Sequence, residues 1–267
     1  MNTGEPDLLK GRCALVTGSV GGLGYAVAEK LSAAGAAVVL HGLATPREAE
    51  AARARLAAQF GNPVLFHGAD LTRVDAIEDL MKAAAAAFGT VDIVVNNAVV
   101  RHVAPVEDFT AGQWDESLAV NLSSAFHAIR LCLPGMRRSG WGRIVNMSSV
   151  YGLSATIDRI GYVTTKTALI GLTRAVALET AATRITCNAL CPGTLPTPAI
   201  LTKISGLAAR QGISESEAAR NYLAERQPSG RFVAMQSVGA MVVFLCSEAG
   251  DDITGAVLPV DGGWTAS

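Results

Sequence analysis

The sequence predicts an α/β fold in which one parallel β-sheet is covered by helices on both faces. Short runs rich in Val, Ile and Leu alternate with longer amphipathic or Ala-rich segments along the 267 residues. These runs lack period-two alternation, as expected for parallel strands that are buried on both faces. Regular alternation of such strands with helices is typical of a doubly wound sheet. No break in composition suggests a linker, so we expect a single domain over residues 1–267.

Seven strands are expected to alternate with six helices. The strand runs are, in chain order, Cys13–Thr17, Ala36–His41, Pro63–His67, Val91–Val95, Gly142–Met147, Arg184–Leu190 and Ala256–Val260. The helices expected between them are Gly22–Ala34, Pro46–Phe60, Arg73–Phe88, Ala111–Ser139, Gly161–Ala182 and Gln236–Ser247. Because helical crossovers join the strands, we expect a seven-stranded parallel sheet.

A long connection after Leu190 interrupts this alternation. Within it, Ser214 and Glu217 have the spacing of a capping box, which predicts a helix that begins near Glu215. Long excursions at one end of a sheet are usually functional or mobile. We therefore interpret the segment from about Pro198 to Pro228 as a small helical lid over a ligand site. An inert surface insertion is the alternative.

Composition and charge exclude several classes of protein. The 22 basic and 23 acidic residues give a net charge of -1, without the positive field of a nucleic-acid binder. No apolar run approaches the ~18 residues of a membrane-spanning helix. The five cysteines form no CxxC pair, and the four histidines show no metal-ligand spacing, so we expect no metal. The first ten residues are polar and do not resemble a signal peptide, so we expect a cytoplasmic protein.

A glycine-rich loop joins the first strand to the first helix. It has the pattern TGxxxGxG and contains Gly18, Ser19, Gly22, Leu23 and Gly24. Glycines at these positions allow a tight turn, and the helix that follows presents free N–H groups and the positive end of its dipole. Between a strand and a helix, this pattern predicts a site for the pyrophosphate of a dinucleotide.

This loop resembles that of the short-chain dehydrogenase/reductase family, whose other elements follow in order along nearly the whole chain. These elements are Asp70-Leu71, Asn97-Ala98, Asn121, Ser149, Tyr162 with Lys166 in a YxxxK pattern, Pro192-Gly193 and Thr197. The resemblance implies a Rossmann fold that binds a nicotinamide dinucleotide. It also implies that Asp70 holds the adenine amino group and that Thr197 contacts the nicotinamide carboxamide. One departure is Val99, which stands where the family has a glycine beside the cofactor.

The catalytic residues follow from the same resemblance and from chemistry. Removal of hydride from an alcohol needs a base for the hydroxyl proton and a group that stabilises the developing charge. Tyr162 and Lys166 are four residues apart and share a helix face, so the lysine can make the phenol a usable base near neutrality. The resemblance implies that Ser149, rather than Ser148, holds the substrate oxygen. It also implies that Asn121 anchors a water that relays protons from Lys166.

The end of the second strand decides between NAD and NADP. An acid there would bind the ribose 2′-hydroxyl and repel a 2′-phosphate, but the strand ends at His41. NADP enzymes of the family place an arginine beside the glycine loop or just after this strand. Neither Ser19 nor Leu43 is basic, and Arg47 falls in the next expected helix. We therefore expect NAD, with NADP as the alternative, and include His41 among the cofactor-binding residues.

The expected substrate is a small anionic hydroxy compound. Several stretches resemble bacterial 3-hydroxybutyrate dehydrogenases, but the residues that hold the substrate carboxylate there are replaced. Their places are taken by Arg101, Tyr151, Arg159 and Lys203, and Thr194 stands in place of a tryptophan. Arginine forks bind carboxylate, sulfonate or phosphate oxygens. We therefore expect a substrate other than 3-hydroxybutyrate, such as a sugar acid, a dicarboxylate or an organosulfonate.

Other functions are compatible with the same motifs. A polyol or sugar dehydrogenase, or a 3-oxoacyl-type reductase, would use the same catalytic residues. A non-enzymatic nucleotide-sensing regulator commonly lacks the tyrosine or the lysine, whereas both Tyr162 and Lys166 are present here. The family resemblance further implies a homotetramer with the helices at 111–139 and 161–182 and the C-terminal strand in its interfaces.

Overall fold

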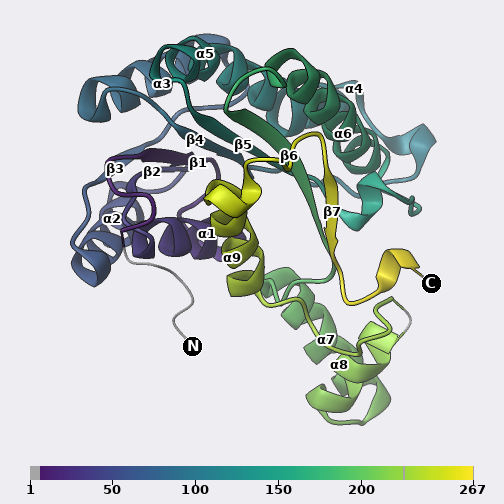
Figure 1. Cartoon of the computed structure of the whole chain (residues 1–267). Coiled ribbons are helices and arrows are strands. Elements are labelled where there is room, and N and C mark those ends of the chain that lie inside the picture. The colour runs from purple at the N-terminus through teal and green to yellow at the C-terminus, as the bar shows by residue number, and fades with distance from the viewer. Residues whose placement is uncertain (1–6, 225, 267) are drawn as a thin grey trace.

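A seven-stranded parallel sheet forms the centre of the computed structural model, which describes residues 7–224 and 226–266 (Figure 1). The strand order is β3-β2-β1-β4-β5-β6-β7. The strands are β1 (Cys13–Val16), β2 (Ala37–His41), β3 (Val64–His67), β4 (Ile93–Asn96), β5 (Gly142–Met147), β6 (Ile185–Pro192) and β7 (Val257–Val260). The predicted doubly wound α/β fold is therefore confirmed. The expectation that residues 1–10 form no signal peptide falls in part on residues 1–6, which lie outside the described residues.

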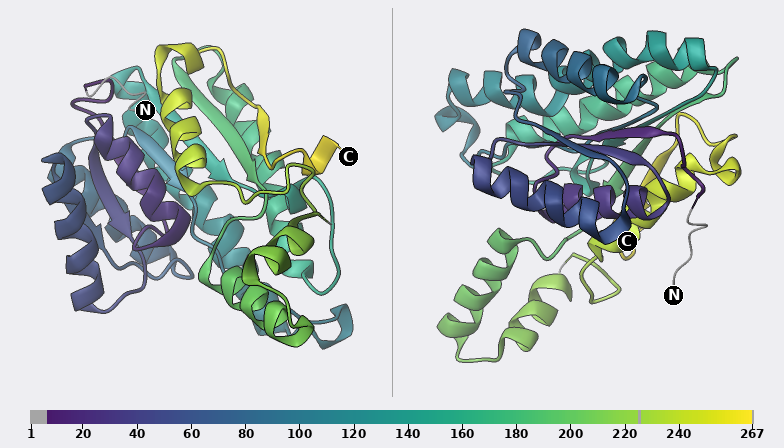
Figure 2. Two further views of the ribbon diagram at one scale, coloured as in Figure 1. Left: turned by 90° about the horizontal axis from the view of Figure 1, so that it is seen from below. Right: turned by 90° about the vertical axis from the view of Figure 1, so that its left-hand side faces the viewer.

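Helices cover both faces of the sheet (Figures 1 and 2). One face carries α1 (Gly22–Ala33), α2 (Pro46–Phe60) and α9 (Met235–Cys246). The other carries α3 (Val74–Phe88), α5 (Ser124–Ser139) and α6 (Ile160–Thr180), with α4 (Ala111–Leu118) beside α6. Short 3-10 helices lie at Val106–Asp108, Val150–Gly152, Glu248–Gly250 and Trp264–Ala266. None of the helices in the described ranges is both long enough and apolar enough to span a membrane.

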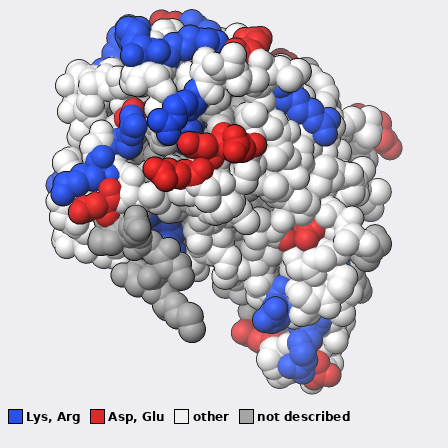
Figure 3. Space-filling view, in the orientation of Figure 1, with Lys and Arg blue, Asp and Glu red and all other residues white. Residues whose placement is uncertain are grey.

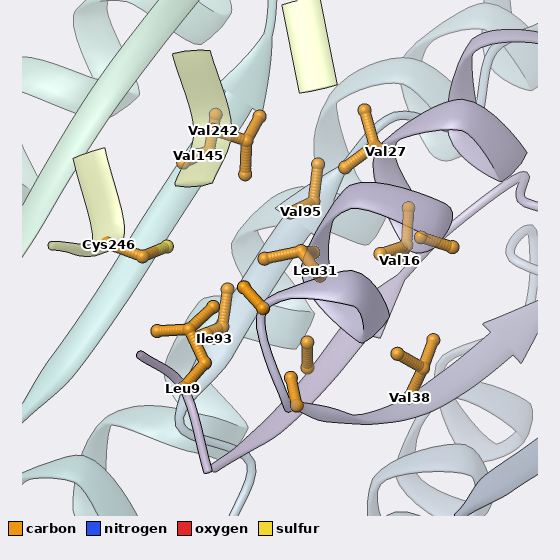
Figure 4. Close-up of a cluster of buried hydrophobic side chains, with 14 of the residues drawn as sticks. Leu9, Val16, Val27, Leu31, Val38, Ile93, Val95, Val145, Val242 and Cys246 are labelled. Carbon is orange, nitrogen blue, oxygen red and sulfur yellow. The ribbon is translucent and has the colours of Figure 1, made fainter. Parts of the chain in front are cut away.

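Alternate residues of each buried strand supply two separate cores. Val16 and its neighbours pack with Val27 and Leu31 of α1 on one face (Figure 4). Leu15 packs on the other face, with Ile129 of α5. Burial on both faces explains why the strands read as continuous apolar runs, and it fixes the carboxyl ends of the strands along one rigid edge.

The expected helix at Ala111–Ser139 is interrupted, which corrects the sequence prediction. A π-helical turn at Ala119–Ser123 separates α4 from α5 and contains Asn121. The Asn121 carboxamide accepts a hydrogen bond from the Val100 N–H (2.8 Å) and donates one to the Val100 carbonyl (3.1 Å). An isolated π turn often marks a functional position. Here the Asn121 side chain connects the turn between α4 and α5 to the loop that follows β4.

The segment after β6 forms two helices that project from the sheet (Figure 1). They are α7 (Pro198–Gln211) and α8 (Glu215–Ala224), and they pack on each other through a small apolar cluster of their own. The start of α8 matches the prediction, and the Ser214 hydroxyl accepts from the Glu217 N–H (3.2 Å). Helix α7 was not predicted as a separate helix from the sequence.

Candidate active site

A cavity of about 450 Å³ lies at the carboxyl ends of the central strands and extends to the helices α7 and α8. The predicted site residues that line it are Gly18, Gly22, Leu23, Gly24, Asn97, Ala98, Arg101, Ser149, Tyr151, Arg159, Tyr162, Lys166, Pro192, Gly193 and Thr197. Val99 lines it as well. A larger cavity, of about 750 Å³, lies near the amino ends of the strands and contains none of these residues. The smaller cavity is therefore the candidate active site.

The glycine loop is packed so closely at Gly18 and Gly24 that a side chain would not fit at either position. Gly18 has a positive φ of 64°, and a Cβ atom there would lie 2.9 Å from the Ala98 Cα. A Cβ atom on Gly24 would lie 2.1 Å from the Gly18 carbonyl oxygen. The Asn97 side chain fixes this arrangement, because its amide donates to the carbonyls of Thr17 (2.9 Å) and Gly18 (3.0 Å). The residues that follow β1 and β4 are thus held together as one rigid wall of the cavity.

The start of α1 fits the diphosphate of a nicotinamide dinucleotide. Gly21 is the N-cap and supplies no side-chain cap, and both Gly21 and Gly22 line the cavity. The N–H groups of the first helical turn and the positive end of the helix dipole therefore face the space where a diphosphate would bind.

Tyr162 and Lys166 lie side by side on α6, and both are buried. The Lys166 Nζ atom is 5.7 Å from the centroid of the Tyr162 ring and donates a hydrogen bond to the Met147 carbonyl (2.6 Å). Burial and, to a smaller extent, the positive charge of Arg101 together lower the pKa of Lys166 to about 7, because both disfavour the ammonium form. The lysine is thus poised to exchange a proton near neutral pH.

The two serines after β5 have different environments. The Ser148 hydroxyl donates to the Lys166 carbonyl (2.7 Å), which ties this side chain to α6. The Ser149 Oγ accepts a hydrogen bond from the Tyr151 N–H (3.2 Å) at the cavity wall. This arrangement favours Ser149 as the group that meets a substrate oxygen.

The charged residues that line the cavity are all basic. They are Arg101, Arg159, Lys166 and Arg226, and no Asp or Glu is among the described lining residues. Elsewhere the charges are mixed: Figure 3 shows basic and acidic side chains close together on the main body and on the projecting helices. The cavity therefore has a local positive charge in a chain whose net charge is -1.

A backbone contact joins the two loops that carry Arg101 and Arg159. Asp158 has a φ of 62° and is the one non-glycine residue with a positive φ in the described ranges. Its carbonyl accepts a hydrogen bond from the Ala104 N–H (3.1 Å). Such left-handed geometry is uncommon outside glycine and costs free energy, so the surrounding contacts must hold it. It fixes Arg159 relative to the loop after Arg101.

Six predicted site residues do not line the cavity, namely Ser19, His41, Asp70, Leu71, Asn121 and Lys203. Lys203 was expected to bind the substrate, but it is an exposed residue of α7 that does not line the cavity. Its Nζ atom lies 5.3 Å from the centroid of the Tyr222 ring. Asp70 accepts hydrogen bonds from the backbone and side chain of Thr72, which lower the pKa of its carboxyl group. Ser19 and His41 are buried behind the glycine loop.

Several lining residues were not assigned to the site from the sequence, and three of them carry large or charged side chains: Tyr222, Arg226 and Trp264. Tyr222 and Arg226 come from the end of the projecting segment, and the Arg226 guanidinium carbon lies 4.2 Å from the Tyr222 ring centroid. Trp264 meets Tyr151 edge-on with 5.5 Å between ring centroids, and Tyr151 meets Tyr162 edge-on at 6.5 Å. The Trp264 indole ring therefore extends the wall of aromatic rings that starts at Tyr162. Trp264 could have been predicted as a site residue, because it directly follows Gly262-Gly263 after the end of the last strand.

Comparison with known proteins places these features in a family. The family model described as enoyl-(acyl carrier protein) reductase matches residues 18–265. A D-beta-hydroxybutyrate dehydrogenase of Cupriavidus necator is 45% identical over 97% of this chain and 100% of its own length. The chain belongs to the short-chain dehydrogenase/reductase family. It is accordingly an oxidoreductase of this family.

Other members of the short-chain dehydrogenase/reductase family match equally long stretches. A D-beta-hydroxybutyrate dehydrogenase of Rhizobium meliloti is 40% identical over 96% of this chain and 99% of its own length. The crystal structure of L-sorbose reductase from Gluconobacter frateurii, complexed with NADPH and L-sorbose, superposes with a TM-score of 0.92. That protein is 27% identical, and the match covers 98% of this chain and 99% of that one.

Proposed function

We propose that this protein is an NAD-dependent dehydrogenase of a small anionic hydroxy compound. It transfers hydride between nicotinamide and the secondary alcohol or ketone of that compound. The observation that carries the proposal is the charge of the cavity: its described lining includes four cationic side chains and no carboxylate. Charge-assisted hydrogen bonds to a carboxylate, sulfonate or phosphate group would offset the cost of bringing these cations together.

The residues of this chain divide the chemistry among them. Bound NAD accepts or supplies the hydride. Ser149 holds the substrate oxygen, and Tyr162 takes the proton of the hydroxyl group during oxidation and returns it during reduction. Lys166 stabilises the phenolate form of Tyr162 by its charge and binds the ribose next to nicotinamide. The π turn positions Asn121 at the back of the site, where it orders the proton path from Lys166.

The basic residues approach the substrate from two sides. Arg101 and Arg159 come from loops over the sheet, and Arg226 comes from the helical lid of residues 198–228. Arg226 therefore supplies the positive charge from the lid that was expected of Lys203. The two relatives named D-beta-hydroxybutyrate dehydrogenase support an anionic substrate. The cations in this chain favour a bulkier or more highly charged one, such as a sugar acid, a dicarboxylate or an organosulfonate.

The proposed cofactor is NAD rather than NADP. The loop after β2 carries Leu43, which is 76% exposed, and Arg47 lies within α2. A 2′-phosphate at the end of β2 would therefore meet an apolar side chain rather than a guanidinium group. The complex of L-sorbose reductase with NADPH supports the alternative cofactor, so both must be measured.

The wider setting we propose is a homotetramer in the cytoplasm, with residues 1–267 forming a single domain. Phe126 on α5 and Leu178 on α6 are 48% and 81% exposed, and a shared interface between subunits would cover them. All five cysteines are unpaired, as is usual in reducing compartments.

A substrate panel tests the proposed function. The purified protein is incubated with NAD or with NADP and with secondary alcohols that are either anionic or neutral, and reduction of the cofactor is followed by absorbance. The anionic set contains 3-hydroxybutyrate, sugar acids, malate and hydroxyalkyl sulfonates, and the neutral set contains polyols. We expect turnover with NAD in the anionic set. Turnover of polyols alone would contradict the proposal.

A further inference from the structure

The His41 side chain connects two loops at the cofactor end of the sheet. It is the last residue of β2, and the whole residue is 2% exposed. The Gly18 N–H donates a hydrogen bond to the Nδ1 atom of the ring (3.2 Å), and the Nε2 atom lies 2.9 Å from the Ala69 carbonyl oxygen. Gly18 belongs to the glycine loop, and Ala69 directly precedes Asp70. One ring therefore joins the loop expected to hold the diphosphate to the loop expected to hold adenine.

The backbone of His41 binds the same glycine loop. Its N–H donates to the Ser19 hydroxyl (3.0 Å), and its carbonyl accepts from the Ser19 N–H (2.7 Å). The Ser19 hydroxyl in turn donates to the Val16 carbonyl (2.7 Å). The contacts of Ser19 with His41 and Val16 thus hold the start of the glycine loop on the side away from the cavity, which neither Ser19 nor His41 lines.

These contacts select one protonation state of the ring. The Gly18 N–H is a donor, so Nδ1 must carry a lone pair, whereas the Ala69 carbonyl is an acceptor, so Nε2 must carry the proton. Neutral His41 with its proton on Nε2 satisfies both partners. A second proton on Nδ1 would point at the Gly18 N–H and break that contact.

We propose that neutral His41 is a positioning residue for the cofactor, one that holds the Gly18 turn and the Ala69–Asp70 turn at the spacing that dinucleotide binding needs. This inference rests on the proposed binding of a nicotinamide dinucleotide. It replaces the sequence-based expectation that His41 binds the cofactor directly. The ring acts from behind the loop, through Gly18, and does not line the cavity.

The surroundings of the ring make this role sensitive to pH. Burial lowers the pKa of His41 below its ordinary value, the hydrogen bond with Ala69 raises it in part, and His67 lowers it further. His67 lies opposite His41 on β3, and Asp70 follows the Ala69 contact. A histidine with a lowered pKa is neutral at neutral pH and takes up a proton only under more acidic conditions than an exposed histidine. Cofactor binding should therefore weaken only at acidic pH, where His41 becomes protonated and loses its hydrogen bond with the Gly18 N–H.

Three variants separate this role from general support of the fold. His41→Asn retains an acceptor for the Gly18 N–H and removes the titratable group. His41→Phe retains a ring but leaves the Gly18 N–H and the Ala69 carbonyl without partners. His67→Asn is the matched control, since it removes the neighbouring histidine and neither of these contacts.

The test is the affinity for NADH, measured by fluorescence titration of the protein without substrate at about pH 8 and about pH 5.5. In the wild type and in His67→Asn, we expect the Kd to rise as the pH falls. In His41→Asn, the Kd should change less with pH than in the wild type, because the titration of Lys166 remains and that of His41 is removed. In His41→Phe, it should be raised by about tenfold or more at both pH values, as expected when buried partners are left unpaired.

Hydrogen exchange of the peptide that contains Gly18 gives a second measurement without any cofactor. We expect faster exchange in His41→Phe than in the wild type, with His41→Asn close to the wild type. A folded His41→Phe protein that binds NADH as tightly as the wild type and protects Gly18 equally well would overturn the proposal. If the wild type binds no dinucleotide at all, the proposed function fails and cofactor positioning fails with it. The exchange result then shows whether His41 holds the loop.

Discussion

Arg101 lies against the ring of Tyr162, with 5.3 Å between its guanidinium carbon and the ring centroid. Its charge also contributes to the lowered pKa of Lys166, on the same helix as Tyr162. A residue that we expect to bind the substrate anion therefore also influences the proton-transfer residues. Substrate binding would neutralise Arg101 and remove its repulsion of the Lys166 ammonium. This coupling links anion recognition to catalysis in the proposed mechanism.

Tyr162→Phe should abolish turnover and preserve cofactor affinity. The substitution removes only the hydroxyl group, so the edge-on contact with Tyr151 remains. Loss of a positioned acid–base group typically lowers the rate by ~10²–10⁴-fold. Steady-state kinetics and titration with NADH check the two parts. Retention of more than about a tenth of wild-type turnover would show that another group is the base.

Lys166→Met should stabilise the protein and abolish turnover. The unfolded lysine binds a proton with its ordinary pKa of 10.5, whereas burial lowers the folded pKa to about 7. Between these values the unfolded state holds more protons, so the stability of the wild type rises with pH and is lost as the pH falls toward 7. The variant should lack this dependence and exceed the wild type near pH 7 by on the order of 1–4 kcal/mol.

Urea unfolding of Lys166→Met and the wild type at several pH values checks this expectation. The gain in unfolding free energy should shrink as the pH rises. A variant less stable than the wild type at neutral pH would mean that the bond from Nζ to the Met147 carbonyl outweighs the cost of burying the charge.

Arg226→Ala and Lys203→Ala should differ in their effect on KM, although both residues lie near the Tyr222 ring. Arg226 lines the cavity and Lys203 does not. A charge-assisted hydrogen bond contributes ~1.5–3 kcal/mol, so loss of the arginine should raise KM for an anionic substrate by ~10–150-fold. Lys203→Ala serves as the control and should change KM less than about twofold. Equal effects of the two substitutions would exclude a specific role for Arg226.

Gln227→Leu should loosen the attachment of the projecting segment that carries α7 and α8, which we propose is a lid. Gln227 is fully buried; its side-chain oxygen accepts from the Thr194 N–H and its amide donates to the Arg231 carbonyl (2.5 Å). It thus joins the two ends of the lid. A buried donor left without a partner costs ~1–3 kcal/mol, so we expect faster proteolysis between α7 and α8 and a lower urea midpoint. Equal sensitivity of Gln227→Leu and the wild type would refute this role.

The sequence was sufficient for the fold and for most of the cavity because both depend on local patterns. Continuous apolar runs identified the strands, and residues placed after those strands meet at one edge of the sheet. The π turn at Asn121 was not predictable, since an extra residue within a helix leaves no break in the apolar pattern. Lys203 was expected at the substrate and Arg226 was not identified, because the direction of each side chain depends on how α7 and α8 pack, which the sequence alone does not reveal. His41 was expected to bind the cofactor directly, but its ring is buried and contacts Gly18 and Ala69 instead.

The central claim is that positive charge in the cavity selects an anionic substrate, and one comparison tests it most directly. The best anionic substrate from the panel and its neutral amide are compared by kcat/KM in the wild type and in Arg101→Ala. We predict that Arg101→Ala lowers kcat/KM by ~10–150-fold for the acid, mainly through KM, and much less for the amide. Equal losses for the acid and the amide would contradict the account, because they would show that Arg101 supports the structure and does not recognise the anion.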